Sequence, residues 1–214
     1  MENKEIFKHI DHTLLKAYSS YEDIKTLCDE AVKNQTASVC IPQTYIKRVK
    51  DNYPSLNVCT VIGFPLGYNS TKSKIVEAEN AMEDGASEID MVINISDVKN
   101  GDYQKVEDEI KALRKTCQGK ILKVIVETCY LTDDEKIEMC KAVTNAKADY
   151  IKTSTGFGTG GAKMEDILLF KKHIGEDVKI KASGGVKSKE DLIAFIEAGC
   201  DRIGTSSAVK MLTK

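Results

Sequence analysis

The stretch EIDMVINISDVKNGDYQKVEDEIKALRKTCQGKILKVIVE, residues 88–127, contains two short apolar runs separated by an amphipathic segment. The runs, at 88–94 and 121–127, have the length of strands and are rich in β-branched residues. The segment between them, from about Tyr103 to Cys117, repeats its apolar residues at helical spacing. A strand, a helix and a second strand in this order predict two parallel strands joined by a helix that packs on the sheet.

The same unit recurs along the whole chain. Further strands are predicted at 10–15, 37–41, 57–64, 149–153, 178–183 and 201–205, and further helices at 20–34, 42–51, 73–84, 132–145, 163–174, 188–198 and 207–212. This regular alternation predicts an α/β protein, a (β/α)8 TIM barrel with a short N-terminal helix. An open doubly wound sheet is the alternative, but the GxGxxG motif is missing after the first strand. No linker-like tract divides the chain, so we expect one domain over residues 1–214.

The composition excludes several classes of partner. The chain carries a net charge of -2, with acidic and basic residues interleaved, so nucleic acid and anionic membranes are not expected as partners. The seven cysteines are scattered without the spacing of a zinc site, and no metal ion is predicted. The N-terminus lacks a signal-peptide core, and no apolar run is long enough to span a membrane, so we expect a cytoplasmic protein.

Strand periodicity places charged residues inside the predicted barrel. Successive side chains of a strand point to opposite faces, so an apolar outer face of Ile89 and Met91 turns Asp90 inward. The same rule gives an inner face to Asp11, Thr13, Glu88, Lys123, Glu127, Lys152 and Lys181. Buried charges are costly unless they are paired, and barrel active sites lie at the C-terminal ends of the strands. We interpret the cluster as a candidate active site, with a structural ion-pair network or rim lysines as the alternative.

Three loops that follow the last three strands are rich in glycine and small hydroxyl residues. They are TSTGFGTGGA at 153–162, SGGVKS at 183–188 and GTSSA at 204–208. Backbone N–H groups of such turns bind anions, and barrels commonly bind phosphate after strands seven and eight. The loops therefore predict a phosphorylated ligand.

The lysine cluster and these loops together indicate a reaction. A buried lysine beside a second lysine loses its proton more easily, and the neutral amine can attack a carbonyl to form a Schiff base. A nearby carboxylate can move the protons that this chemistry needs. The residues therefore predict a metal-free aldolase that acts on a phosphorylated sugar.

Several motifs carry a resemblance to a known family. They are IDHTLLK at 10–16, ASVCIPQ at 37–43, VIGFPLG at 61–67, GASEIDMVINI at 85–95, LKVIVET at 122–128, YIKTSTGFGTGGA at 150–162, KASGGV at 181–186 and RIGTSSAV at 202–209. In these motifs the chain resembles the deoxyribose-phosphate aldolases, class I aldolases that interconvert 2-deoxy-D-ribose 5-phosphate with D-glyceraldehyde 3-phosphate and acetaldehyde.

The resemblance implies a role for each matching residue. Lys152 is the expected Schiff-base lysine, Lys181 the second lysine that keeps it nucleophilic, and Asp90 the acid/base carboxylate that works through an ordered water. The expected phosphate ligands are Gly156, Gly184, Gly185, Gly204, Ser206 and Ser207, with Asp11, Thr13 and Lys123 in support. It further implies a cytoplasmic homodimer without a cofactor, in deoxynucleoside catabolism.

Two positions depart from some members of that family. Phe157 stands where some members carry a lysine, and Lys187 where others carry an arginine, so the affinity for phosphate is in question. Two other functions are considered, a transaldolase or ketose-phosphate aldolase and a binding protein without catalysis. Acetaldehyde and dihydroxyacetone phosphate as alternative donors would distinguish the aldolases, whereas intact Lys152, Lys181 and Asp90 argue against a mere binding protein.

Overall fold

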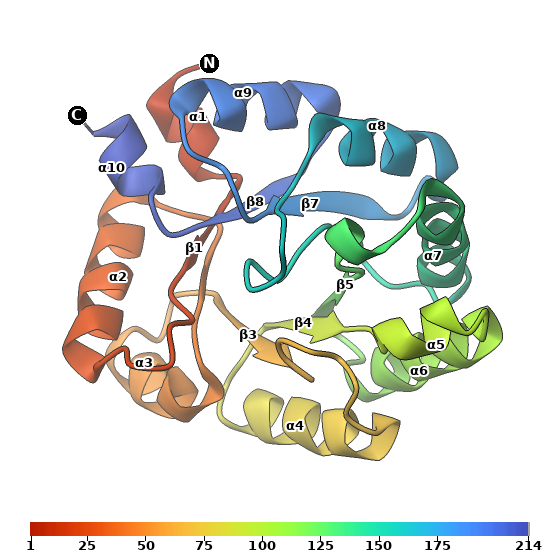
Figure 1. Ribbon diagram of the computed structural model, residues 1–214. Coiled ribbons are helices and arrows are strands. Elements are labelled where there is room, and N and C mark those ends of the chain that lie inside the picture. Colours follow the sequence, from red (N-terminus) through yellow and green to blue (C-terminus); the bar gives the residue numbers. More distant parts are fainter. Residues whose placement is uncertain (214) are drawn as a thin grey trace.

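Eight parallel strands form a closed barrel in the computed structural model, which describes residues 1–213 (Figure 1). The strands are β1 (Ile10–Thr13), β2 (Ser38–Cys40), β3 (Val58–Ile62), β4 (Glu88–Val92), β5 (Ile121–Ile125), β6 (Tyr150–Lys152), β7 (Lys179–Ser183) and β8 (Arg202–Thr205). Each strand pairs with the next in the chain, and β8 pairs with β1 through Asp11 opposite Gly204. The predicted TIM barrel is confirmed, because the pairing of β1 with β8 closes the ring of strands, whereas an open sheet has two edge strands.

Helices surround the barrel on its outside (Figure 1). The helices after the strands are α2 (Tyr21–Asn34), α3 (Ile46–Asn52), α4 (Thr71–Glu83), α6 (Tyr103–Thr116), α7 (Asp133–Asn145), α8 (Met164–His173), α9 (Lys189–Ala198) and α10 (Ala208–Leu212). The expected short N-terminal helix is α1 (Asn3–Phe7). None of the helices in residues 1–213 combines the length and apolarity that crossing a membrane requires.

Local signals in the sequence set the helix starts. Ser20, Thr132 and Ser188 each accept a hydrogen bond from the backbone N–H three residues on, and the acidic side chain at that position accepts one from the backbone N–H of the cap residue. These capping boxes satisfy N–H groups that the first helical turn leaves free. Helix α9 ends at Gly199, whose φ of 113° suits a residue without a side chain.

Two short elements differ from the expectation. Helix α5 (Ile95–Lys99) forms between the predicted strand at 88–94 and the helix from about Tyr103, where no helix was predicted, because the Asn94 side chain accepts the Ser96 N–H and caps it. Strand β5 ends at Ile125 rather than at Glu127, which adopts a left-handed φ of 56°. A 3-10 turn, η2 (Thr128–Tyr130), follows. A second 3-10 turn, η1 (Gln43–Tyr45), precedes α3.

The hydrophobic core lies between the barrel and the helices. The outward residues of the strands, Ile89, Met91, Leu122, Val124, Ile151 and Ile180, are all buried there as the periodicity predicts. Each buried side chain of this size stabilises the fold by about 1.5–3 kcal/mol relative to exposure. The inner face of the same strands carries charged residues instead, and these build the site.

Candidate active site

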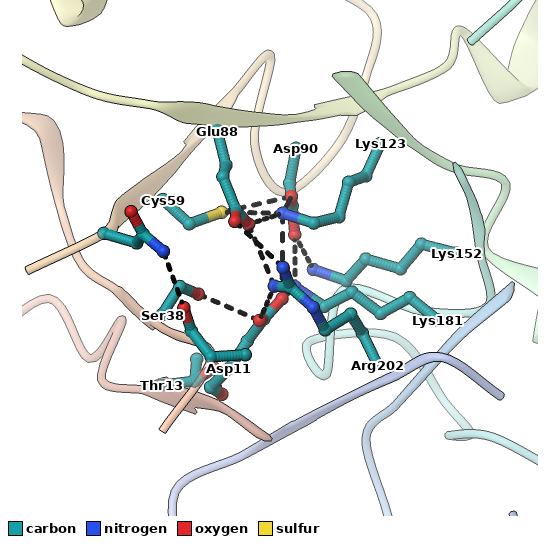
Figure 2. A network of polar contacts seen from close by, with 12 residues as sticks. Asp11, Thr13, Ser38, Cys59, Glu88, Asp90, Lys123, Lys152, Lys181 and Arg202 are labelled. Carbon is teal, nitrogen blue, oxygen red and sulfur yellow. Dashed lines mark hydrogen bonds and ion pairs between the residues drawn. The ribbon is translucent and has the colours of Figure 1, made fainter. Parts of the chain in front are cut away.

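Asp90 is the centre of the charged cluster inside the barrel (Figure 2). Its Oδ2 atom lies 2.7 Å from Lys152 Nζ and 2.8 Å from Lys181 Nζ. Its Oδ1 atom accepts hydrogen bonds from Lys123 Nζ at 2.9 Å and from the thiol of Cys59 at 3.1 Å. The predicted trio of Lys152, Lys181 and Asp90 is therefore brought together, with Lys123 as a fourth member.

A second layer lies toward the N-terminal ends of the strands. Asp11 contacts Lys181 Nζ at 2.5 Å through Oδ2 and Arg202 at 2.5 Å through Oδ1. Glu88 accepts from Lys123 Nζ at 2.5 Å and from Arg202 at 3.2 Å. The network therefore runs from Arg202, at the start of β8, to Lys152, at the end of β6.

Opposite charges fix the protonation of the buried carboxylates. Burial alone would raise the pKa of Asp90, but the ammonium groups of Lys123, Lys152 and Lys181 hold it well below its usual range. Asp11 is likewise buried, yet nearby lysines and Arg202 lower its pKa.

The carboxylates act on the cations in return. Burial would lower the pKa of Lys181, but Asp11 and Asp90 raise it. Lys123 follows the same pattern, with Asp90 as its strongest carboxylate partner. Both carboxylates are therefore ionised at neutral pH, and Lys181 and Lys123 are held as cations.

A cavity of about 420 Å³ opens above this network. Of the four cations in the network, Lys152 is the one that lines it. The predicted phosphate ligands all border the same cavity, namely Gly156, Gly184, Gly185, Gly204, Ser206 and Ser207, and Thr13 does so from β1. Asp11, Asp90, Lys123 and Lys181 lie fully buried beneath it. The volume suits a small ligand.

Glycines allow the walls of this cavity to pack closely. A Cβ atom on Gly161 would lie 2.4 Å from the carbonyl of Gly184, so the loops after β6 and β7 touch backbone to backbone. The N–H of Ala162 donates to the Gly184 carbonyl at 3.1 Å and fixes that contact. On β8, a Cβ atom on Gly204 would lie 3.2 Å from Lys181 Cε, so glycine leaves room for the lysine.

Glu127 supports the loop that follows Lys152. Its carboxylate accepts the Thr155 N–H at 3.2 Å and also contacts the Thr155 hydroxyl. Burial raises the pKa of Glu127, and the hydrogen bonds from Thr155 oppose this shift in part. Glu127 thus lies inside the barrel mouth as predicted, but it contacts the loop rather than the lysines.

One group of potential metal ligands occurs within residues 1–213. Donor atoms of Cys40, Cys59 and Asp90 lie within 4.8 Å of one another. However, both oxygens of Asp90 are held by ammonium groups, and Lys123 Nζ lies 3.4 Å from Cys59 Sγ. A metal cation there would meet strong repulsion, so this group suits protonated amines better than a metal ion.

Sequence reasoning missed three members of the network. Arg202 shares the inner face of β8 with Gly204, and Ser38 and Cys59 contact Asp11 and Asp90 from β2 and β3. Strand periodicity, applied to the short run at 201–205, contained the signal for Arg202. Nothing in the sequence distinguishes Ser38 or Cys59 from ordinary small core residues.

Known proteins match this chain over almost its whole length. A family model described as DeoC/LacD family aldolase matches residues 4–207. A deoxyribose-phosphate aldolase from Clostridium botulinum (strain Alaska E43 / Type E3) is 64% identical over 213 residues, covering 99% of this chain and 96% of the relative. One from Clostridioides difficile (strain 630) is 58% identical over 210 residues, covering 98% and 96%.

A solved structure agrees with these relatives. A tetrameric deoxyribose phosphate aldolase from Aeropyrum pernix superposes with a TM-score of 0.93 at 31% identity, covering 99% of this chain and 91% of that one. The family model, the sequence relatives and this structure all lead to one conclusion: the chain is an aldolase that belongs to the DeoC/LacD family.

Proposed function

We propose that this chain reversibly cleaves 2-deoxy-D-ribose 5-phosphate to D-glyceraldehyde 3-phosphate and acetaldehyde through a Schiff base on Lys152. The observation that carries the proposal is the position of the Lys152 amine. It is the cation of the network that borders the cavity, 2.7 Å from the Asp90 carboxylate. The activity named for the relatives supports the choice of substrate.

The first half of the reaction forms the imine. The neutral Lys152 amine attacks the C1 aldehyde of the open-chain sugar, and the carbinolamine takes up a proton on its hydroxyl and loses water to give a protonated imine. Asp90 Oδ2 lies between the amines of Lys152 and Lys181, so it can pass a proton from one side to the other. An ordered water is the expected carrier between Asp90 and the substrate carbon.

The second half breaks the carbon–carbon bond. A base removes the proton of the C3 hydroxyl, the C2–C3 electron pair moves into the iminium, and glyceraldehyde 3-phosphate leaves. The remaining enamine takes a proton at C2 through Asp90 and its water. Hydrolysis of the imine then releases acetaldehyde and returns the free amine.

The glycine- and serine-rich wall supports phosphate binding. Gly184, Gly185, Ser206 and Ser207 border the cavity, and backbone N–H and hydroxyl groups of such residues suit a phosphate dianion. Phe157 also borders the cavity but adds no charge, since its side chain is a hydrocarbon ring, which packs edge-on against Phe64 with centroids 5.2 Å apart. Lys187 borders a neighbouring groove rather than this cavity.

The test is chemical trapping of the imine. The protein is incubated with acetaldehyde and borohydride, digested, and analysed by mass spectrometry. We expect a 28 Da ethyl adduct on Lys152, since reduction fixes the two-carbon imine. Lys16 also borders the cavity and is the matched control. Lys16→Met should keep the label and Lys152→Met should lose it, whereas a label elsewhere would contradict the mechanism.

A ketose-phosphate aldolase is the alternative within the same chemistry. In that case dihydroxyacetone phosphate, rather than acetaldehyde, would be the donor that reduction traps on the protein. The three-carbon adduct differs in mass, so the same experiment separates the two.

The remaining expectations from the family resemblance are also proposals. We propose a single aldolase domain over residues 1–214, a homodimer, and a cytoplasmic role in deoxynucleoside catabolism. The Aeropyrum pernix relative is a tetramer, so a dimer of this chain would mean that the number of subunits differs between the two proteins. Light scattering on the protein as it elutes from a size-exclusion column measures the molar mass of the assembly and hence the number of subunits.

A further inference from the structure

The charged groups that contact one another inside the barrel do not balance. The cations are Lys123, Lys152, Lys181 and Arg202, and the anions are Asp11, Glu88 and Asp90. Four cations against three carboxylates leave one excess positive charge in a space shielded from water. An uncompensated buried charge is costly, so the network favours the loss of one proton.

The contacts decide which cation loses it. The guanidinium of Arg202 does not deprotonate in proteins. Lys181 contacts Asp11 and Asp90, and Lys123 contacts Glu88 and Asp90 with Asp11 at 3.7 Å. Among residues 1–213, Lys152 has ion-pair contact with Asp90 alone, through the oxygen that Lys181 also uses. Lys152 is therefore the cation that is held least.

Arg202 creates the imbalance from the other end of the barrel. It contacts the carboxylates of Asp11 and Glu88, which are the second partners of Lys181 and Lys123 (Figure 2). Its own side chain is 14% exposed, and it makes no ion pair with the carboxylate of Asp90. Arg202 thus pairs with two of the three carboxylates without contacting the Lys152 amine.

We propose that Arg202 is a positioning residue that makes the Lys152 amine available. Because Arg202 neutralises the equivalent of one of the three carboxylates, only two negative charges remain to balance the three lysines. The inference rests on the proposed Schiff-base mechanism and extends it to a residue that touches neither the substrate nor Lys152. A plain structural role would predict a loss of stability and no change in the pH dependence of imine formation.

The other titratable groups around the network leave this count unchanged. Burial raises the pKa of the Tyr150 phenol, whose ring lies 5.9 Å from the Arg202 guanidinium, and that of the Cys59 thiol beside Asp90. The hydrogen bond with the Cys59 thiol lowers the pKa of the neighbouring Cys40 thiol, but burial and the Asp90 carboxylate oppose this shift, so Cys40 is counted as a neutral thiol. Ser38 donates to Asp11, Glu127 bonds to Thr155, and Lys179 points outward toward Asp201.

The experiment follows the rate of reductive trapping of acetaldehyde on Lys152 across pH. In Arg202→Gln, three cations face three carboxylates, so every lysine can keep its proton. We expect the profile to move at least about one unit toward alkaline pH, which makes trapping about tenfold slower at neutral pH. Arg202→Lys keeps the charge and should keep the profile of the parent.

A double variant separates charge from structure. Arg202→Gln combined with Glu88→Gln removes one charge of each sign, restores the excess positive charge, and should return the profile toward that of the parent. Lys74→Met is the matched control, since Lys74 is a buried lysine that pairs with Glu109 at 2.8 Å between α4 and α6, outside the barrel. It should lower stability and leave the profile in place.

Two results would overturn the proposal. One is an Arg202→Gln profile that coincides with that of the parent, and the other is a double variant that stays as shifted as the single one. If Arg202→Gln does not fold, Glu88→Gln alone decides, because its two excess positive charges should move the profile toward acid pH. An unlabelled Lys152 in the parent would refute the Schiff base itself, which distinguishes that failure from a failure of the Arg202 role.

Discussion

Ile89 and Asp90 are neighbours on one strand, and both are fully buried, yet they belong to two different interiors. Ile89 points into the apolar layer under the helices, whereas Asp90 points into the barrel and contacts three lysines. Every side chain that the apolar layer removes from water stabilises the folded state. The charged interior gains little net stability, because desolvation offsets the attraction between its ions. The difference teaches that this fold keeps the side chains that stabilise it apart from those to which we assign its chemistry.

The largest effect is expected when the amine that borders the cavity is replaced. Lys152→Arg keeps a positive charge beside Asp90 but cannot form an imine, because guanidinium stays protonated. We expect turnover of 2-deoxyribose 5-phosphate to fall by about 10⁴-fold or more, while the free energy of unfolding stays near that of the parent. Denaturant titration and a steady-state assay measure the two quantities on one sample. A variant that retains a substantial part of the activity would contradict the covalent mechanism.

The opposite pattern is expected in the apolar layer. Met91 is fully buried on the outer face of β4, next to Asp90 in the sequence. Met91→Ala should lower the free energy of unfolding by about 2–5 kcal/mol, since it removes apolar contacts and leaves a cavity. Turnover per folded molecule should stay within a factor of about two, because the charged network is untouched. A large loss of turnover in the folded variant would mean that the two interiors are coupled.

Removal of the second lysine should show itself in the pH dependence. Lys181→Leu takes away one cation and leaves three cations to face three carboxylates. The Lys152 proton is then harder to remove, so the rate at neutral pH should fall at least about tenfold, and the alkaline limb should lose less. A loss that persists at high pH would add proton transfer to the role of Lys181. Near-parent rates with an unmoved profile would make Lys181 a structural residue.

Acid should act on the charged interior and spare the apolar layer. The pKa values of Asp90 and Asp11 are lowered in the folded state by their cationic neighbours. Their stabilising contribution is therefore complete above the unfolded pKa of about 3.9 and is lost as the pH falls below it. Thermal unfolding from pH 7 to pH 3 should show stability falling mainly below about pH 4.5. The deficit of Met91→Ala should stay constant over this range.

Much of the fold and of the candidate site could be predicted from the sequence, because both depend on periodicity. The two-residue repeat of β4 and β5 was enough to place Asp90 and Lys123 inside, and the structure brings them to 2.9 Å. The place of the glycine-rich loops could be predicted equally well, since loops that follow β6, β7 and β8 lie together at the C-terminal end of the barrel.

What could not be predicted depends on single backbone angles or on very short elements. A left-handed Glu127 ends β5 early, and no local signal requires a glutamate to adopt that conformation. Helix α5 spans five residues, too few for a periodic pattern to emerge. Arg202 is an intermediate case, because the periodicity of the run at 201–205 contains its signal, yet it opens a four-residue strand, where a charged residue ordinarily indicates a solvent-exposed rim.

The contact between Arg202 and Asp11 joins positions 191 residues apart. On the ribosome, Asp11 is therefore made long before its guanidinium partner, which lies on β8, the last strand of the barrel. Before β8 is made, β1 and β7 lack the strand that pairs with both of them in the closed barrel. Under the role proposed for Arg202, the excess positive charge therefore exists only once β8 has joined the barrel, so a chain that still lacks β8 should not yet have an activated Lys152 amine.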